Sequence, residues 1–118
     1  MSKKTIYGVV PSKSNCYKII TLAGHGSLAK TKALKQYEKD FYIQCTERDR
    51  NIEGYFELHM DVYYPSQRAD LDNSLKVVND MLQKCGVVKN DNQCVHLNIR
   101  KFLDKNNPRI EYEVIPIK

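Results

Sequence analysis

The segment YFELHMDVYY, residues 55–64, constrains the fold of this chain more than any other part of the sequence. Its apolar side chains alternate with more polar ones, which is the pattern of a β-strand with one face in a core and the other face wetter. Pro65 follows directly and ends the strand, because proline cannot donate a hydrogen bond to a neighbouring strand. We therefore expect a sheet that is covered on one face.

Two helices are expected to provide that cover. Apolar residues recur at helical spacing over residues 31–46 and again over residues 73–85, where Gly86 supplies the stop. The order of elements predicts an α+β fold with a single domain over residues 1–118, and a mixed or mostly antiparallel sheet with two main helices packed on it. The other expected strands are residues 5–10, 17–23, 94–102 and 109–117, the last two joined as a hairpin by residues 103–108.

The segment GHGSLAKT, residues 24–31, has the outline of a phosphate-binding loop but lacks one part of it. The pattern requires a second glycine before the lysine so that the backbone can wrap closely around phosphate. Ala29 stands at that position, and its methyl group obstructs the approach. We therefore expect no nucleotide hydrolysis, and residues 24–27 are predicted to form a flexible loop.

The charge of the chain favours a polyanionic partner. The net charge is +5 and the isoelectric point about 9.0, and lysines crowd into the first third of the sequence. No apolar run approaches the roughly 18 residues of a membrane span, and the N-terminus has no signal-peptide pattern, so a cytoplasmic location is expected. The four cysteines form no CxxC pair, which disfavours a zinc finger and predicts buried free thiols.

The segment RADLDNSLK, residues 68–76, carries two carboxylates at a predicted strand-to-helix junction. Asp70 and Asp72 are two residues apart, a spacing that turns side chains about 200° apart on a helix but to the same side of extended chain. They can therefore share a ligand only if both precede the helix. Such a pair of hard oxygen ligands would suit Mg²⁺, whereas the alternative is that Asp72 caps the helix and Asp70 is solvated.

Lys76 and Asp91 favour the metal interpretation. Lys76 lies one turn into the predicted helix, where an ammonium group can support a phosphate and its developing charge. The helix over residues 73–85 would be about 18 Å long, and the five extended residues from 86 to 91 span at most about 17 Å. If those residues run back along the helix, Asp91 reaches the end that carries the other two carboxylates.

The segment DLDNSLKVVNDMLQKCGVVKNDNQ, residues 70–93, resembles the core of the RusA-type Holliday junction resolvases. The segment VPSKSNCYK is similar to the family's Pro-Pro-Ser-x-Asn-x-x-Tyr/Trp segment, and HLNIRK is similar to a family strand that ends in lysine. The chain departs from the family at Ala69, where a basic residue is common, and at Asn90, where a second Asp is common. The matching core residues are Asp70, Asp72, Asn73, Lys76, Asp80, Gly86, Asp91 and Gln93.

The resemblance implies a homodimeric, Mg²⁺-dependent endodeoxyribonuclease that resolves four-way DNA junctions by paired symmetric nicks, in recombination and repair. Under it, Asp70, Asp72 and Asp91 hold Mg²⁺, for which Mn²⁺ can substitute, and Lys76 supports the phosphate. No small-molecule cofactor and no membrane partner are expected, and the protein is expected to be associated with the nucleoid. The residues expected to contact the DNA backbone are Lys13, Asn15, Lys18, Lys30, Lys32, Arg68, Arg100 and Lys101.

Two alternatives remain open from the sequence. One is a non-catalytic DNA-binding module of the same fold, in which the carboxylates are only capping or solvated. The other is a metal nuclease for other branched DNA or for RNA, because an acidic site of this kind is generic. Outside the motif, Asp80 is expected to pair with Lys76 or Lys84 at helical spacing, and His59 and His96 are expected to be partly buried and structural.

Overall fold

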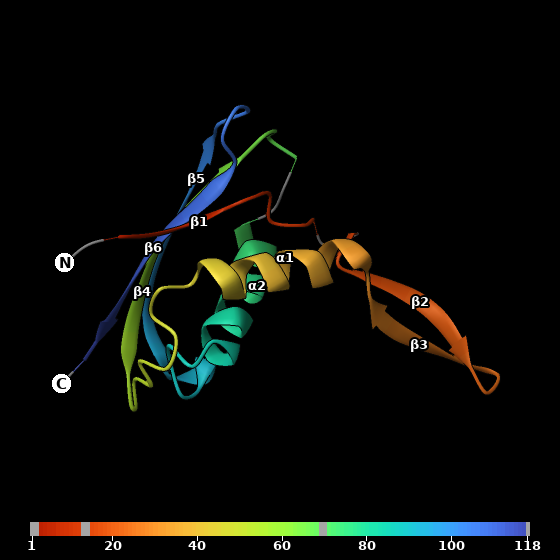
Figure 1. Ribbon diagram of the computed structural model, residues 1–118, viewed down its shortest axis with the longest axis horizontal. Coiled ribbons are helices and arrows are strands. Elements are labelled where there is room, and N and C mark those ends of the chain that lie inside the picture. The colour runs from red at the N-terminus through yellow and green to blue at the C-terminus, as the bar shows by residue number, and fades with distance from the viewer. Residues whose placement is uncertain (1–2, 13–14, 69–70, 118) are drawn as a thin grey trace.

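The computed structural model of the chain describes residues 3–12, 15–68 and 71–117. A four-stranded sheet in the order β1-β6-β4-β5 forms the body, and a separate two-stranded hairpin, β2-β3, projects from it (Figure 1). The helices are α1 (Lys32–Gln44), α2 (Leu71–Lys84) and a short 3-10 turn, η2 (Asp91–Gln93). The strands are β1 (Lys4–Tyr7), β2 (Tyr17–Leu22), β3 (His25–Lys30), β4 (Phe56–Tyr64), β5 (Cys94–Leu103) and β6 (Arg109–Pro116). The predicted α+β class, with a mixed sheet and two main helices, is confirmed.

The strand predicted from the alternation of residues 55–64, β4, lies inside the sheet. It runs antiparallel to β6 on one side and parallel to β5 on the other. The predicted hairpin between the last two strands is therefore wrong, because β4 lies between β5 and β6. Strands that are close in the chain do not have to pair with each other. β4 turns its apolar face into the core and has a partner along each edge, so β5 and β6 both form hydrogen bonds with β4.

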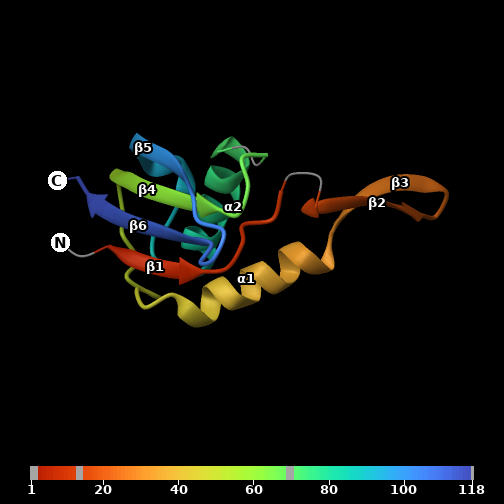
Figure 2. The same cartoon turned by 90° about the horizontal axis from the view of Figure 1, so that it is seen from above.

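The core lies between the sheet and the two helices, which cover the same face of it (Figures 1 and 2). Alternate side chains of β4 point into this core, and those between them point to the opposite face, called the outer face below. The fully covered core residues of β4 are Phe56, Leu58, Met60, Val62 and Tyr64, and the helices contribute Leu34, Tyr37, Phe41, Val77, Val78, Met81 and Leu82. The outer face of β4 presents Glu57, His59 and Asp61.

The hairpin β2-β3 replaces the loop expected at residues 24–27, so that prediction is wrong. The reversal occurs at Ala23 and Gly24, both of which have positive φ angles, 51° and 83°. Two consecutive residues in this conformation match the right-handed twist of paired strands and make a tight hairpin turn. The hairpin extends away from the helices (Figure 2), and its cross-strand partners Ile19 and Leu28 are 80% and 70% exposed.

The base of the hairpin is fixed to α1. Thr31 follows β3 and caps α1, with its side chain accepting a hydrogen bond from the Leu34 amide at 3.2 Å. The Thr31 amide donates to the Cys16 carbonyl at 2.9 Å, and its hydroxyl donates to the Asn15 carbonyl. These contacts orient the two strands relative to the body.

Three of the four cysteines, Cys16, Cys45 and Cys85, are buried, and Cys94 is half-buried. All four are free thiols, in agreement with the prediction. No helix in the part of the chain that the structure describes is long and apolar enough to cross a membrane.

Candidate functional site

The polar face of α2 carries Asp72, Lys76 and Asp80 at intervals of four residues. Residues four apart lie above one another on a helix, so the three charged groups form one row with the ammonium group between the carboxylates. Asp72 and Lys76 are exposed, and Asp80 is half-buried. The opposite side of the helix is held in the core by Val78 and Leu82, which fixes the direction in which the row faces.

The helix begins two residues earlier than the sequence pattern indicates. Leu71 is its first residue and packs against the core, and its carbonyl accepts a hydrogen bond from the buried Ser74 hydroxyl at 2.6 Å. Asp72 therefore lies in the first helical turn, and its carboxylate accepts a hydrogen bond from the Asn73 amide at 3.0 Å. The expectation that Asp72 stands on extended chain before the helix is wrong, and Asp70 lies outside the described residues.

Asn73 joins the start of α2 to the segment that precedes β2. Its side-chain amide donates to the Pro11 carbonyl at 2.7 Å and lies 3.9 Å from the Cys16 sulfur. Burial raises the pKa of the Cys16 thiol, so it is a neutral part of this junction. The contact places Tyr17 near the row on α2, with the Lys76 ammonium 6.0 Å from the centre of the tyrosine ring.

Asp91 reaches α2 through two side chains of the helix. The Asp91 amide donates to the Gln83 side chain at 2.9 Å, and its carbonyl accepts from the Asn79 side chain at 3.4 Å. Asn90 caps the turn η2 by accepting from the Asn92 amide. Residues 86–91 do run back along α2, as the metal interpretation requires, but they place Asp91 beside the second half of the helix.

Asp80 and Asp91 face each other across this junction. Burial raises the pKa of Asp80, and the negative charge of Asp91 raises it further. Lys84 and Lys76 act in the opposite direction but do not outweigh these effects. The lysines expected to pair with Asp80 therefore have less effect on it than burial and Asp91 do. Asp80 matches the family core but is not among the metal ligands expected from the sequence, and the structure brings it close to one of them, Asp91.

The candidate ligand atoms of Asp72, Asp80 and Asp91 are of the type that hard divalent cations bind. All are carboxylate oxygens, and the repulsion between Asp80 and Asp91 would be relieved by a positive charge placed between them. Among the described residues, Asp72, Asp80 and Asp91 do not form a group whose ligand atoms all lie within 4.8 Å of one another. Asp72 lies two helical turns from Asp80, about 12 Å along the axis, which explains the separation.

The described basic residues that are predicted to contact a polyanion lie on the hairpin, at the start of α1, after β4 and on β5. Lys18 is exposed on β2, and Lys32 is exposed at the start of α1. Lys30 at the end of β3 forms an ion pair with Glu38 at 2.9 Å, and Glu38 also binds Lys84 at 3.0 Å. Lys101 on β5 donates to the Gln67 carbonyl at 2.7 Å, and Lys13 lies outside the described residues.

Asn15 and Arg68 line one cleft of about 350 Å³ between the segment before β2 and the chain after β4. The other residues that line it include Pro11, Ser12 and Pro65, and Asn15 itself stands two residues before the hairpin begins at Tyr17. The two residues are far apart in sequence, so only the fold brings them together. Arg68 is exposed at the edge of this cleft.

Arg100 lies apart from the other predicted basic residues, on the outer face of the sheet. Its guanidinium binds the Asp61 carboxylate through two hydrogen bonds of 2.9 and 3.0 Å, and Lys3 binds the same carboxylate at 3.1 Å. Burial raises the pKa of Asp61, but the hydrogen bonds from Arg100 and Lys3 outweigh it and hold that pKa below its usual range. Arg100 thus neutralises a buried charge on the face opposite the row of α2.

Comparison with known proteins matches most of the chain. The family model described as Endodeoxyribonuclease RusA matches residues 11–115. The crossover junction endodeoxyribonuclease RusA of Aquifex aeolicus (strain VF5) is similar to this chain, with 25% identity over 96 residues. That similarity covers 79% of this chain and 76% of the relative. The family match spans the row on α2, the turn η2, the hairpin and most of the residues that line the cleft.

Proposed function

Because the chain belongs to the endodeoxyribonuclease RusA family, it is a nuclease of the Holliday junction resolvase type, and we propose that it cuts four-way DNA junctions by paired symmetric nicks with the help of Mg²⁺. The observation that carries the proposal is the facing pair of Asp80 and Asp91, at the end of a row that also holds Asp72 and Lys76. A carboxyl group whose pKa is raised by burial and by a second carboxylate, as that of Asp80 is, is typical of a site that binds a cation.

We propose that Asp70, Asp72 and Asp91 supply the metal ligands, with Asp80 beside Asp91. Because Asp72 lies about 12 Å from Asp80 along α2, the two ends of the row would bind separate cations. A bound divalent cation would activate water and neutralise charge on the phosphate during hydrolysis. Mn²⁺, which also takes carboxylate oxygen ligands, would substitute. Without the cation, the carboxylates repel a phosphate backbone, so the same residues that support cleavage oppose binding of DNA.

Lys76 is proposed to support the scissile phosphate. Its position between Asp72 and Asp80 in the row keeps an ammonium group beside the place where negative charge accumulates. The helix fixes its Cα, and the nearby ring of Tyr17 limits the directions that the side chain can take. Asn73 supports this arrangement indirectly by fixing the start of α2 to the Pro11 carbonyl.

The DNA backbone is proposed to run across the cleft between the segment before β2 and the chain after β4. Lys18 and Lys32 on one side and Arg68 on the other can contact phosphates without reading base sequence. Lys13, Asn15, Lys30 and Lys101 belong to the same proposed surface. Arg100 is left out of it, because its guanidinium is engaged with Asp61 on the outer face.

A homodimer is part of the proposal. A four-way junction has two equivalent strands to cut, and a dimer with twofold symmetry provides two equivalent sites. Branched DNA is then the partner, the nucleoid the place of action, and recombination and repair the processes served. No small-molecule cofactor is required by a reaction in which water is the nucleophile.

The test is incubation of the full chain with a synthetic four-way junction and with a linear duplex of matched sequence, each with Mg²⁺ and with EDTA. Paired nicks in the junction alone, and only with Mg²⁺, are expected. Junction binding without any cleavage would support the non-catalytic binding module instead. Equal cleavage of flaps or RNA would support a nuclease for other branched substrates. Sedimentation of the protein alone and with junction measures the dimer.

A further inference from the structure

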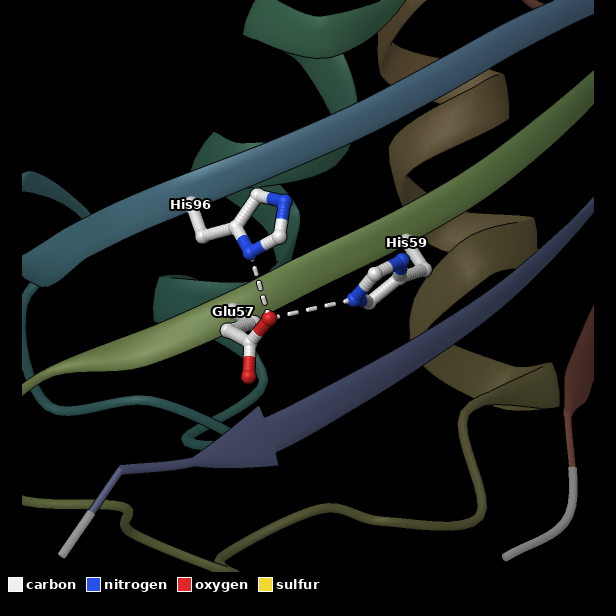
Figure 3. Close-up of side chains that lie close together, drawn as sticks. All are labelled: Glu57, His59 and His96. Atoms are coloured by element: carbon white, nitrogen blue, oxygen red, sulfur yellow. Dashed lines mark ion pairs between the residues drawn. The ribbon is translucent and has the colours of Figure 1, made fainter.

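The outer face of the sheet carries a cluster of side chains that the proposed nuclease site does not use: Glu57 and His59 on β4 and His96 on β5 (Figure 3). Glu57 and His59 are two residues apart on one strand, so they point to the same face. His96 is the direct partner of Glu57 in the parallel pairing of β4 with β5. The backbone register therefore brings the three together, on the side of the sheet opposite the helices.

The donor atoms of the three side chains are close. A carboxylate oxygen of Glu57 lies 2.5 Å from Nδ1 of His96 and 3.5 Å from Nε2 of His59, and the two rings have centroids 5.4 Å apart. One donor atom from each residue lies within 4.8 Å of the others. Donor atoms bound to a tetrahedral ion at 2.0–2.1 Å lie roughly 3.3 Å apart, so small side-chain rotations suffice to complete a site.

The cluster is open to solvent and has the donor chemistry of a transition-metal site. The side chains of Glu57, His59 and His96 are 27%, 33% and 57% exposed, and a cavity of about 270 Å³ adjoins His59. Two imidazole nitrogens and one carboxylate form a donor set that zinc enzymes use, with a fourth position left for water. Mg²⁺ prefers oxygen ligands alone, so it would not compete well here.

We propose that Glu57, His59 and His96 form a binding site for a divalent transition-metal ion of the Zn²⁺ class, separate from the carboxylates of α2. The ion would join β4 to the start of β5, which pairs with β4 alone among the described strands. His96 lies five residues after Asp91 in the chain, so the ion would also stabilise the segment that positions Asp91. The proposal concerns metal binding and stability, and it holds whether or not the chain cuts junctions.

The test uses the full chain stripped with EDTA and titrated with Zn²⁺ by calorimetry, and with Co²⁺ by visible absorption. We expect one ion per chain, a higher melting temperature with Zn²⁺, and little competition from excess Mg²⁺. His59→Ala, His96→Ala and Glu57→Gln are each expected to weaken Zn²⁺ binding by at least about tenfold. Circular dichroism of the metal-free variants verifies that they are folded.

Three control variants separate this site from other ligands in the chain. His25→Ala removes the histidine at the tip of the hairpin, Cys94→Ser removes the half-buried thiol next to His96, and Asp91→Asn alters the proposed nuclease site. All three are expected to keep the Zn²⁺ affinity of the unaltered chain. Failure of the unaltered chain to bind Zn²⁺, or binding that depends on Cys94 and survives loss of both His59 and His96, overturns the proposal. The Co²⁺ spectrum gives a second readout, because thiolate ligation adds an intense charge-transfer band that imidazole and carboxylate ligands lack.

Discussion

The carboxyl group of Asp80 in α2 faces that of Asp91 in the turn η2, and its pKa is raised first by burial and then by the charge of Asp91. Folding therefore brings together two negative charges that the unfolded chain keeps apart. Such an arrangement lowers the stability of the protein in the absence of a cation. The contribution of Asp80 to the free energy of unfolding should fall as the pH rises through its pKa, and binding of a cation should raise that free energy.

Asp80→Asn is expected to stabilise the metal-free protein at neutral pH by about 0.5 kcal/mol, the scale of a single like-charge contact. A carboxyl group whose pKa is raised by folding holds its proton more tightly in the folded state. Its stabilising contribution is complete below the ordinary carboxyl pKa and is lost as the pH rises through the raised value. Urea unfolding in EDTA between pH 3 and pH 7 measures this, and the variant should lose that part of the pH dependence.

With Mg²⁺ present, the unaltered chain should be more stable than Asp80→Asn, which is the reverse of the order expected in EDTA. A cation between Asp80 and Asp91 stabilises the unaltered chain and has less to bind in Asp80→Asn. If Mg²⁺ raises the melting temperature of both proteins equally, Asp80 does not border the metal.

Asp70→Asn, Asp72→Asn and Asp91→Asn are each expected to abolish cleavage while junction affinity in EDTA stays equal or rises. Removing one negative charge weakens the repulsion of phosphate, and the loss of a hard oxygen ligand removes the cation that cleavage needs. Gel-shift titration and single-turnover cleavage measure the two effects separately. Asp40→Asn on α1 is the matched control, since among the described residues the Asp40 carboxylate accepts a hydrogen bond from Gln36 alone, and it should cleave normally. Parallel loss of binding and cleavage would argue for a structural role.

Lys76→Met is expected to slow single-turnover cleavage by roughly 10²-fold or more, with folding and most of the junction affinity kept. Lys76→Arg should restore little of the rate, because a planar guanidinium does not replace a compact ammonium group at a tight site. Lys105→Met, at an exposed lysine in the connection between β5 and β6, is the control for loss of one charge. A rate near that of the unaltered chain in Lys76→Met would place Lys76 on a solvated helix face.

Junction affinity should fall steeply with salt, with a slope near −0.9 in log K against log salt for each phosphate contact. Lys18→Gln and Arg68→Gln are each expected to reduce the magnitude of that slope by about one. Arg100→Gln is expected to leave the slope unchanged, since Arg100 binds Asp61 on the outer face. A smaller slope in Arg100→Gln would show that the outer face also meets DNA.

Asn73→Asp is expected to lower the free energy of unfolding by about 1–2 kcal/mol, more than Asn73→Ala. The substituted carboxylate keeps the shape of the side chain but has no proton to donate to the Pro11 carbonyl, so two acceptors face each other. Denaturant midpoints at pH 7 and pH 3.5 test this, and protonation at low pH should recover part of the loss. Equal stability of all three proteins would mean that Asn73 does not hold the start of α2.

The sequence predicted the elements better than their pairing. The alternation along β4 and the apolar stripes of both helices are local patterns, so those elements appear within a few residues of where they were expected. The partners of β5 and β6 depend on which strand occupies the middle of the sheet, and no local pattern encodes that. The hairpin turn at Ala23 and Gly24 was missed because alanine seldom adopts a positive φ.

In the proposed site, too, local spacing is visible in the sequence and long-range contacts are not. Lys76 follows from its place in the motif, but the start of α2 was set by the packing of Leu71 against the core, which places Asp72 in the helix. Asp80 was assigned to lysines on its own helix because spacing along a helix is visible in sequence. The charge with the largest effect on Asp80 is that of Asp91, which is brought there by a turn held by Asn79 and Gln83. That contact is visible only in three dimensions.

The position of β6 between β1 and β4 also determines when the sheet can form. β1 spans residues 4–7, yet its hydrogen-bonded partner is residues 109–112, so the pairing closes a loop of about a hundred residues. During synthesis, β1 emerges from the ribosome long before that partner exists, while α1, the hairpin and the β4-α2 segment can already form local structure. Sheets that depend on such distant pairing fold slowly compared with helical proteins of similar size. The outer face, where Glu57, His59 and His96 meet, is then among the last surfaces to be completed on its β6 side.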